Sequence, residues 1–234
     1  MKTSIDFGLV CAIKEEFQSL ISKITVQSKV EIGRKKVVLG HYNKRRIAII
    51  HTGIGHINAA ASTAALITQY NPASLLFSGI AGALNPCLNI GDVLIGKSCF
   101  QAEAITHEQL RSDWAIPALD KPADSMLLAM AEALYGECPY QVRSGVIVSS
   151  DIFPAPKDCK ALFQEKQADA IDMETAAFYH ACHIFSKPCL SIRSFSNPVT
   201  GAEKEVLEAK NIATSSANAT DFCFRLIDQC AQNA

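Results

Sequence analysis

Two carboxylates, an arginine, a serine and an amide gather near the ends of two apolar segments in the last third of the chain. Asp172 and Glu174 follow the first segment, and Arg193, Ser196 and Asn197 follow the second. Carboxylates can accept protons, and an amide can both donate and accept hydrogen bonds. Such a group of side chains is suited to a small-molecule site. Ordinary polar capping of a strand–helix–strand unit would use the same residue types, so the pattern alone leaves both interpretations open.

The segment that carries these residues predicts a strand, a buried helix and a second strand. Residues 170–173 are mostly apolar, residues 175–185 are apolar on nearly every side, and residues 189–192 form another apolar run of strand length. Pro188 ends the helix, because proline has no N–H to donate and disfavours helix in the residue before it. In open α/β sheets ligands bind beyond the carboxyl ends of strands, so we expect the polar residues to meet there.

Other predicted strand ends carry acidic or glycine-rich residues. Glu16 follows a strand predicted over 5–13, a Gly-x-Gly turn lies at 53–55, a second glycine-rich segment lies at 79–82, and Asp151 follows a further strand. Glycine permits a close backbone approach or a positive φ, although one Gly-x-Gly pair is a weak signal. An acidic residue in the first turn of a helix is also favoured by the helix dipole, which is the simpler explanation of Glu16.

Composition and charge exclude several classes of protein. The 234 residues carry a net charge of −1, so there is no electrostatic basis for binding nucleic acid or a membrane surface. No apolar run reaches membrane-spanning length, and the N-terminus makes a poor signal peptide. The nine cysteines form no Cys-x-x-Cys pair, which favours free thiols in the cytoplasm over disulfides or a zinc site. The densest basic cluster, at 35–36 and 44–46, is interpreted as the solvated edge of a hairpin.

The remaining pattern predicts a single α/β domain over residues 1–234, a length that suits one large core. We expect an antiparallel meander over 24–51 with breaks at Gly33, Gly40 and Asn43. Periodicity is lost over 100–121, which predicts a long loop. Further strands are expected over 73–78 and 142–149, and further helices over 57–69, 125–135, 159–167 and 211–231.

Taken together, the strand-end motifs resemble the nucleoside phosphorylases and nucleosidases, a family typified by methylthioadenosine/S-adenosylhomocysteine nucleosidase. Each motif alone is weak, but the set is specific and covers nearly the whole chain. The resemblance implies an α/β fold of three layers, α/β/α, with a mixed, twisted and partly closed sheet. The motifs are AIKEEF at 12–17, TGIGHINAA at 52–60, GIAGAL at 79–84 with NIGDV at 89–93, VSSDIF at 148–153, DMETAAF at 172–178 and IRSFSN at 192–197.

The resemblance implies that two carboxylates take part in breaking an N-glycosidic bond. That reaction passes through an oxocarbenium-like ribosyl cation. Glu174 matches the family's ribose-diol carboxylate, whose negative charge stabilises the cation in a dry, preorganised site. Glu16 matches the base that activates the attacking water, and burial would adjust its pKa. No cofactor and no metal ion are implied.

The resemblance also assigns the substrate-binding residues. Met173 matches a thioether that packs against the ribose, and Phe153 matches an aromatic ring that stacks on the purine. Backbone groups near Ile152 and Pro154 would contact the edge of the base. A core methionine and a core phenylalanine are the plainer alternatives. The remaining members of the expected set are Ile54, Ile80, Ala81, Gly82, Asp172 and Ser196.

Phe77 is a first departure from the family pattern. The phosphorylases that the chain resembles carry an arginine just before the Gly-x-x-Gly segment, where it holds phosphate, and this chain has Phe77 there. Without a fixed cation that can bind phosphate through two hydrogen bonds, water is favoured as the nucleophile. The sequence therefore predicts a hydrolase rather than a phosphorylase.

Asn197 is a second departure. Adenine-specific members of the family have an aspartate here, which when protonated donates to N7 and accepts from the N6 amine. Asparagine can instead donate to a carbonyl O6, and its oxygen can accept from a ring N–H. The 6-oxopurine-specific members of the wider superfamily also use asparagine. A hypoxanthine-like base is therefore predicted, and the futalosine hydrolase branch is the first expectation.

Three functions follow from these arguments. The first is hydrolysis of futalosine to hypoxanthine and dehypoxanthine futalosine in menaquinone biosynthesis. The second is an adenine-releasing nucleosidase acting on methylthioadenosine, S-adenosylhomocysteine or aminofutalosine, with Asn197 as a tolerated variant. The third, of another class, is a nucleoside-binding protein without catalysis, which would not need Glu16. The resemblance also implies a homodimer, and the apolar stretches 54–67 and 100–116 support it.

Overall fold

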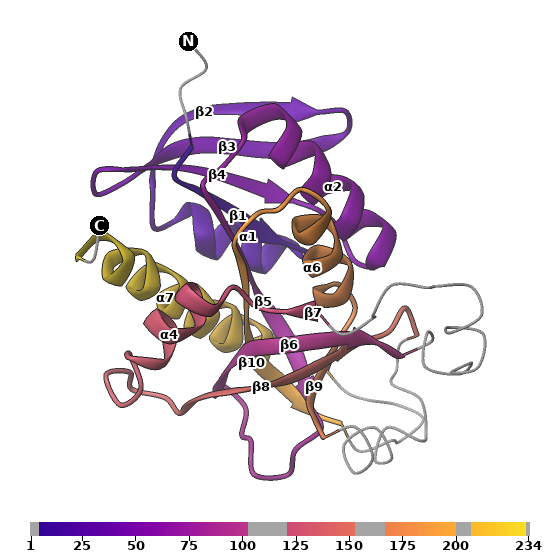
Figure 1. The fold of residues 1–234 in the computed structure, drawn as a ribbon. Coiled ribbons are helices and arrows are strands. Elements are labelled where there is room, and N and C mark those ends of the chain that lie inside the picture. The colour runs from indigo at the N-terminus through magenta and orange to yellow at the C-terminus, as the bar shows by residue number, and fades with distance from the viewer. Residues whose placement is uncertain (1–4, 103–120, 153–166, 200–206, 233–234) are drawn as a thin grey trace.

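The computed structural model describes residues 5–102, 121–152, 167–199 and 207–232 (Figure 1). Two predicted site residues, Phe153 and Pro154, lie outside the described residues. So do nearly all of the helix predicted over 159–167 and of the loop predicted over 100–121.

The described residues form ten strands and five helices. The strands are β1 (Phe7–Cys11), β2 (Thr25–Ile32), β3 (Lys35–Tyr42), β4 (Arg45–His51), β5 (Ser74–Ala83), β6 (Val93–Gln101), β7 (Lys121–Pro122), β8 (Val142–Ser149), β9 (Ala168–Asp172) and β10 (Cys189–Pro198). The helices are α1 (Lys14–Ile21), α2 (His56–Tyr70), α4 (Ser125–Glu132), α6 (Thr175–Ile184) and α7 (Ala209–Gln232).

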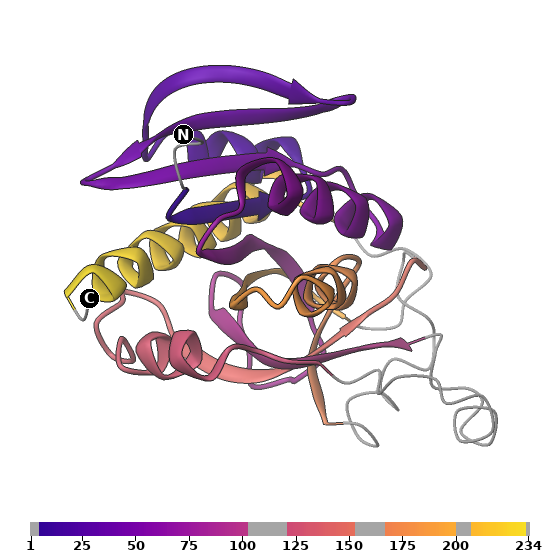
Figure 2. The same ribbon diagram turned by 45° about the horizontal axis from the view of Figure 1, so that its top comes forward.

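One mixed ten-stranded sheet organises the molecule. Its strand order is β10-β6-β8-β9-β5-β1-β4-β3-β2, with β7 on β6. Because β10 also pairs with β5, strands β5, β9, β8, β6 and β10 close into a small barrel. Strands β1, β4, β3 and β2 continue from β5 as an open sheet, and the β2–β3 hairpin arches away from the rest (Figure 2). The mixed, partly closed sheet that the sequence predicted is therefore confirmed.

Apolar side chains cover both faces of the central strands. Val10 and Ile50 belong to one hydrophobic core, whereas their neighbours Leu9 and Ile49 belong to the other. Successive residues of a strand point to opposite faces, so a strand buried on both faces is continuously apolar, as β1 is. Helices α2 and α6 pack together on one side of β5, and α7 packs with α1 and α4 on the other (Figure 1).

The meander predicted over 24–51 is confirmed as β2, β3 and β4. Gly33 and Asn43 adopt positive φ in its two turns. Gly40, predicted as a further break, instead lies inside β3. A Cβ atom at Gly40 would lie 2.4 Å from the Thr25 carbonyl oxygen, so the glycine permits a close approach of two strands rather than a turn.

Strand β5 is longer than the sequence predicted. The strand expected over 73–78 continues through the glycine-rich segment 79–82, which is therefore extended backbone and not a turn. A Cβ atom on Gly79 would lie 2.4 Å from Arg193 Nη1 and 2.8 Å from Glu16 Oε1. Glycine is required at this position because two charged side chains pass directly over the strand.

Strand β10 also extends further than predicted. The strand expected over 189–192 continues through Arg193, Ser196 and Asn197, so these residues lie on the strand and not beyond its end. The register against β5 shifts between Phe195 and Asn197. Such a β-bulge changes the direction in which the following side chains point.

The predicted strand–helix–strand order is confirmed as β9, α6 and β10, but the two strands do not run parallel. Strand β9 pairs antiparallel with β5 and β10 pairs parallel with β5, so β9 and β10 flank β5 and run in opposite directions. Their ends nevertheless meet, because Ile171 and Asn197 are both aligned with Gly82. The two polar segments come together by converging on β5.

Replacing Tyr179 with phenylalanine is expected to destabilise the fold by about 1–3 kcal/mol. The fully buried Tyr179 hydroxyl donates to the Gly96 carbonyl oxygen at 2.5 Å and accepts from the Ser191 N–H at 3.0 Å. Both backbone groups would be left unsatisfied inside the barrel. Denaturant-induced unfolding measures the loss, with Tyr70→Phe at the last turn of α2 as a control. Equal stabilities of the two variants would contradict this account of Tyr179.

Candidate active site

A cavity of about 500 Å³ lies where β5, β9 and β10 converge. All the predicted site residues that the structure describes, except Ile152, line it. Ile152 is 54% exposed and stands outside the lining. The lining residues from the predicted set are Glu16, Ile54, Ile80, Ala81, Gly82, Asp172, Met173, Glu174, Ser196 and Asn197.

Glu16 is buried in the first turn of α1 and is held by three backbone N–H groups. Its Oε2 accepts from Ala12 at 2.7 Å and Ile13 at 3.0 Å, and its Oε1 accepts from Ile80 at 2.9 Å. Burial raises the pKa of the Glu16 carboxyl, whereas the Arg193 guanidinium and the backbone N–H groups lower it. The result is a fixed carboxylate that faces the cavity and has an increased affinity for a proton.

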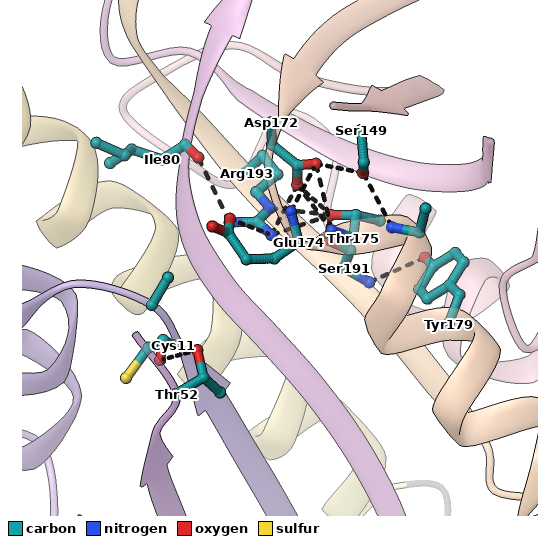
Figure 3. A network of polar contacts seen from close by, with 12 residues as sticks. Cys11, Thr52, Ile80, Ser149, Asp172, Glu174, Thr175, Tyr179, Ser191 and Arg193 are labelled. Atoms are coloured by element: carbon teal, nitrogen blue, oxygen red, sulfur yellow. Dashed lines mark hydrogen bonds and ion pairs between the residues drawn. The ribbon is translucent and has the colours of Figure 1, made fainter. Parts of the chain in front are cut away.

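Arg193 is fully buried and connects the polar residues of the site (Figure 3). Its Nη2 lies 2.7 Å from Asp172 Oδ2 and 3.7 Å from Glu174 Oε2. Its Nε and Nη2 donate to Thr175 Oγ1, and its Nη1 donates to the Ile80 carbonyl oxygen at 3.4 Å. One guanidinium therefore balances two buried carboxylates and touches the strand that forms the floor of the site.

Protein donors engage both oxygens of Asp172. Ser149 Oγ and the Glu174 N–H donate to Oδ1, and Thr175 Oγ1 and Arg193 Nη2 contact Oδ2. The Asp172 side chain is 1% exposed. It borders the cavity, and its hydrogen bonds hold the start of α6 and the guanidinium in place.

Glu174, like Glu16, lines the cavity with its carboxylate. Its Oε1 accepts a hydrogen bond from the Gly55 N–H at 3.0 Å. Burial raises the pKa of Glu174 to about 7; the Arg193 guanidinium lowers it, and the Asp172 carboxylate raises it. Glu174 therefore titrates near neutral pH. It loses its proton and becomes negatively charged as the pH rises through about 7.

Ser196 and Asn197 lie side by side in the cavity, although neighbours on a regular strand face opposite sides. The bulge in β10 explains this arrangement. Ser196 Oγ donates to Asn197 Oδ1 at 3.0 Å, which orients the amide. The amide nitrogen lies toward Gly82 on β5, since a Cβ atom there would be 3.6 Å from Asn197 Nδ2.

Phe77 is fully buried under the guanidinium of Arg193. The Arg193 Cζ atom lies 4.1 Å from the centre of the Phe77 ring, and the ring also packs edge-on against Phe178. An aromatic face attracts a cation, which contributes to keeping a buried guanidinium in place. Phe77 therefore stabilises the Arg193 guanidinium and does not itself provide a positive charge.

Sequence reasoning noted Arg193 as a polar residue but gave it no role. An arginine that follows an apolar strand is usually exposed, and nothing local shows that this one faces two carboxylates. The only available signal was its position directly after the apolar run 189–192 and three residues before Ser196. Gly55 was noted for its turn, yet its N–H, which contacts Glu174, could not be inferred from the motif alone.

A second cavity, of about 550 Å³, lies between α2 and α6. Ile57, Ile184 and Phe185 stand at this surface and are 84%, 76% and 41% exposed. His56 and His180 line it beside small alanines. We refer to Ile57, Ile184, Phe185 and the alanines between them as the α2–α6 surface.

Within the described residues, no group of three or more His, Cys, Asp or Glu side chains is arranged to hold a metal ion. Among the helices that the structure describes, none is long and apolar enough to cross a membrane. The polar side chains that line the first cavity are the carboxyl groups of Glu15, Glu16, Asp172 and Glu174, the Ser196 hydroxyl and the Asn197 amide.

The chain is similar to known proteins along nearly its whole length. The family model described as the phosphorylase superfamily matches residues 6–232. The 5'-methylthioadenosine/S-adenosylhomocysteine nucleosidase of Staphylococcus haemolyticus is 29% identical over 198 residues, which are 83% of this chain and 87% of that protein. The enzyme of the same name from Staphylococcus carnosus is 30% identical over 203 residues, again 83% of this chain and 87% of that protein.

Solved structures share the fold. The futalosine hydrolase of Helicobacter pylori has a TM-score of 0.86 at 24% identity and covers 96% of this chain and 98% of its own. A mutant Helicobacter pylori methylthioadenosine nucleosidase with 5'-methylthioadenosine in its active site has a TM-score of 0.86 at 25% identity, covering 97% of this chain and 100% of its own. With the family match over residues 6–232, the chain belongs to the phosphorylase superfamily and to its nucleosidase-like members.

Proposed function

We propose that this protein is a purine nucleosidase that hydrolyses futalosine and releases hypoxanthine. Its class, an N-ribosyl hydrolase acting on a purine nucleoside, agrees with the curated relatives, which are named nucleosidases. The choice of futalosine rests on one observation. An amide, Asn197, occupies the position where the adenine-specific members that the chain resembles carry an aspartate, and Ser196 orients that amide.

Asn197 would distinguish two kinds of purine. Ser196 Oγ donates to Asn197 Oδ1 and so orients the amide, and in this orientation the NH₂ would be the group that meets the base. An NH₂ group donates well to the O6 carbonyl of hypoxanthine and cannot pair with the N6 amine of adenine. A buried donor that faces another donor costs about 1–3 kcal/mol. Hydrogen-bonding sites of this kind can discriminate strongly between substrates.

Glu174 would stabilise the ribosyl cation. As the bond between C1′ and N9 breaks, the electron pair leaves with the purine and positive charge develops on the sugar. The Glu174 carboxylate, fixed by the Gly55 N–H and by Arg193, would bind the ribose hydroxyls beside that charge. Met173, from the same segment, would pack against the sugar. Asp172 would act through Arg193 instead of touching the substrate.

Glu16 would be the base that takes a proton from water. The oxygen of that water attacks C1′, and the released proton moves to the Glu16 carboxylate. Burial makes Glu16 a stronger base than an exposed glutamate, and its three backbone N–H partners hold it in one orientation. Phe77 stands at the sequence position where the phosphorylases that the chain resembles carry a phosphate-binding arginine, which supports water as the nucleophile.

An alternative is an adenine-releasing nucleosidase, which the names of the relatives favour. In that case Asn197 would lower the rate because an amide cannot protonate N7. A binding protein without catalysis is less consistent with the site, since binding alone needs no buried, oriented base such as Glu16.

The Glu16→Gln variant is expected to lose about 10²–10⁴-fold in kcat, because an amide cannot accept the proton from water. Nucleoside binding should stay within a few-fold of native. Release of hypoxanthine from futalosine in phosphate-free buffer measures the rate, and Glu132→Gln on the surface of α4 is the control. Near-normal turnover of Glu16→Gln would mean that Glu16 only stabilises the start of α1 and is not the base. In a separate assay with added phosphate, a ribose 1-phosphate product would rule out the hydrolase.

The Asn197→Asp variant is expected to change the base preference. The native enzyme should favour futalosine over aminofutalosine by about ten- to several-hundred-fold in kcat/KM, which corresponds to about 1–3 kcal/mol. A carboxylic acid can protonate N7 and accept from N6, so the substitution should move the ratio toward aminofutalosine. Native and variant proteins are each assayed with both substrates. A native preference for the amino compound, or an unchanged ratio, would exclude Asn197 as the group that recognises the base.

We also propose a homodimer in which the α2–α6 surface packs against a second copy of the chain. This surface is apolar, and Ile57 on it is 84% exposed. Native protein is expected to have the mass of a dimer in light scattering at micromolar concentration. Ile57→Glu should weaken the dimer by roughly 100-fold, because a charge would be buried without a partner. Ile90→Glu, at an exposed position outside this surface, is the control, and a monomeric native protein would refute the proposal.

A further inference from the structure

The turn between β4 and α2 must hold one backbone N–H group in a fixed position. Its Gly55 N–H must stay within hydrogen-bond distance of Glu174 Oε1, at 3.0 Å. Gly53 and Gly55 both adopt positive φ, at 80° and 99°. Glycine loses more conformational freedom on folding than any other residue, so a turn that contains two of them needs additional contacts to remain fixed.

Lys35 supplies contacts of this kind from a distant part of the chain. It stands at the start of β3, and its Nζ donates to the Thr52 carbonyl oxygen at 2.5 Å and to Asn58 Oδ1 at 2.7 Å. Hydrogen bonds from a charged donor are stronger than neutral ones. The neighbouring Lys36 is exposed and forms no hydrogen bond or ion pair among those described. Lys35 is therefore not a member of a solvated edge, in contrast to the interpretation from sequence.

Asn58 extends the reach of Lys35 to the second half of the turn. Its Oδ1 accepts from Lys35, and its Nδ2 donates to the Ile54 carbonyl oxygen at 2.8 Å. The lysine thus fixes which way the asparagine amide faces. Through one ammonium and one amide, the carbonyl groups of Thr52 and Ile54 are both held from outside the turn.

Asp151 holds the other side of the turn. Its Oδ1 accepts from the His56 N–H at 2.9 Å, and its Oδ2 lies 3.0 Å from His56 Nδ1. These contacts fix the start of α2. They do not reach the Thr52 and Ile54 carbonyl groups, which Lys35 and Asn58 hold.

We propose that Lys35, acting through Asn58, is a positioning residue that keeps the Gly55 N–H on Glu174. This inference rests on the proposed role of Glu174 in the hydrolysis. Lys35 does not touch the cavity and is not a catalytic residue. Its effect reaches the reaction through the geometry and the charge of Glu174 alone.

The charge of Glu174 offers a specific readout. The groups that face it are the Arg193 guanidinium, the Asp172 and Glu16 carboxylates and the Gly55 N–H. The Gly55 hydrogen bond favours the ionised carboxylate. When that bond weakens, the proton should be held more tightly, so the titration of Glu174 should move to higher pH.

The first test uses the ligand-free protein and needs no activity. Amide hydrogen exchange at Gly55 is measured by NMR in native protein, Lys35→Met, Asn58→Ala and the control Lys36→Met. Both Lys35→Met and Asn58→Ala should raise the exchange rate at Gly55 by about tenfold or more, because local opening of the turn becomes easier. Lys36→Met should match the native protein. Unchanged exchange in Lys35→Met and Asn58→Ala would overturn the proposal.

The second test follows the Glu174 carboxyl carbon by NMR during a pH titration. Lys35→Met and Asn58→Ala should both move its midpoint to higher pH, and the double variant should move it no further than the larger single effect, because both residues act in one chain of contacts. Asn58→Ala retains the lysine charge, so its shift separates geometry from simple electrostatics. A shift in Lys35→Met alone would overturn the route through Asn58.

The third test uses kinetics to ask whether the β4–α2 turn affects the rate of hydrolysis. With futalosine, kcat/KM of Lys35→Met is expected to fall about tenfold at neutral pH, with the acid limb of its pH profile displaced to higher pH. Faster exchange at Gly55 with an unchanged pH profile would make Lys35 a structural residue only and would overturn the proposal. If native protein hydrolyses no purine nucleoside, the proposed function fails, while the exchange and titration results still decide the role of Lys35.

Discussion

The site depends on one buried guanidinium. Arg193 is completely enclosed and lies 2.7 Å from Asp172 and 3.7 Å from Glu174, with Glu16 close enough to feel its charge. Carboxylates so deeply buried would otherwise bind protons, since removing an ion from water costs several kcal/mol. Arg193 is in turn supported by the Phe77 ring beneath it and by the absence of a side chain on Gly79. The positions of Asp172 and Glu174 therefore depend on the space made for one side chain.

The carboxylates are kept distinct by their hydrogen bonds. Protein groups bind both oxygens of Asp172, so this residue has a structural role. Glu174 accepts a hydrogen bond from one backbone N–H, and burial raises its pKa to about 7. Glu16 has three backbone donors, and no ion pair joins it to a cation in the part of the chain that the structure describes. Burial raises the pKa of both Glu16 and Glu174, while the Arg193 guanidinium and the backbone N–H groups lower it.

Much of the fold could be predicted from sequence, because apolar runs and turn residues act locally. The meander, the helix at 175–185 and the strand over 142–149 were placed correctly or nearly so. Strands β5 and β10 were cut short, since their glycines and polar residues look like strand ends when no partner is known. Many of the residues that line the cavity could be named from motifs, but Arg193 and Lys35 were not given roles. Their partners are distant in sequence, so a local sequence pattern cannot predict these contacts.

The closure of the barrel has a consequence for how the enzyme becomes active during folding. Strand β10 pairs with β5, from which it is separated by almost half the chain, and this pairing brings Asn197 to Gly82. Contacts between distant segments form slowly because a long loop must first be ordered. Strand β1, helix α1 and strand β4 are closer in sequence and can assemble earlier, but the end of the cavity that carries Asn197 cannot exist before β10 docks. Recovery of activity after dilution from denaturant should therefore follow the last step of assembly, after most of the helical signal has already returned.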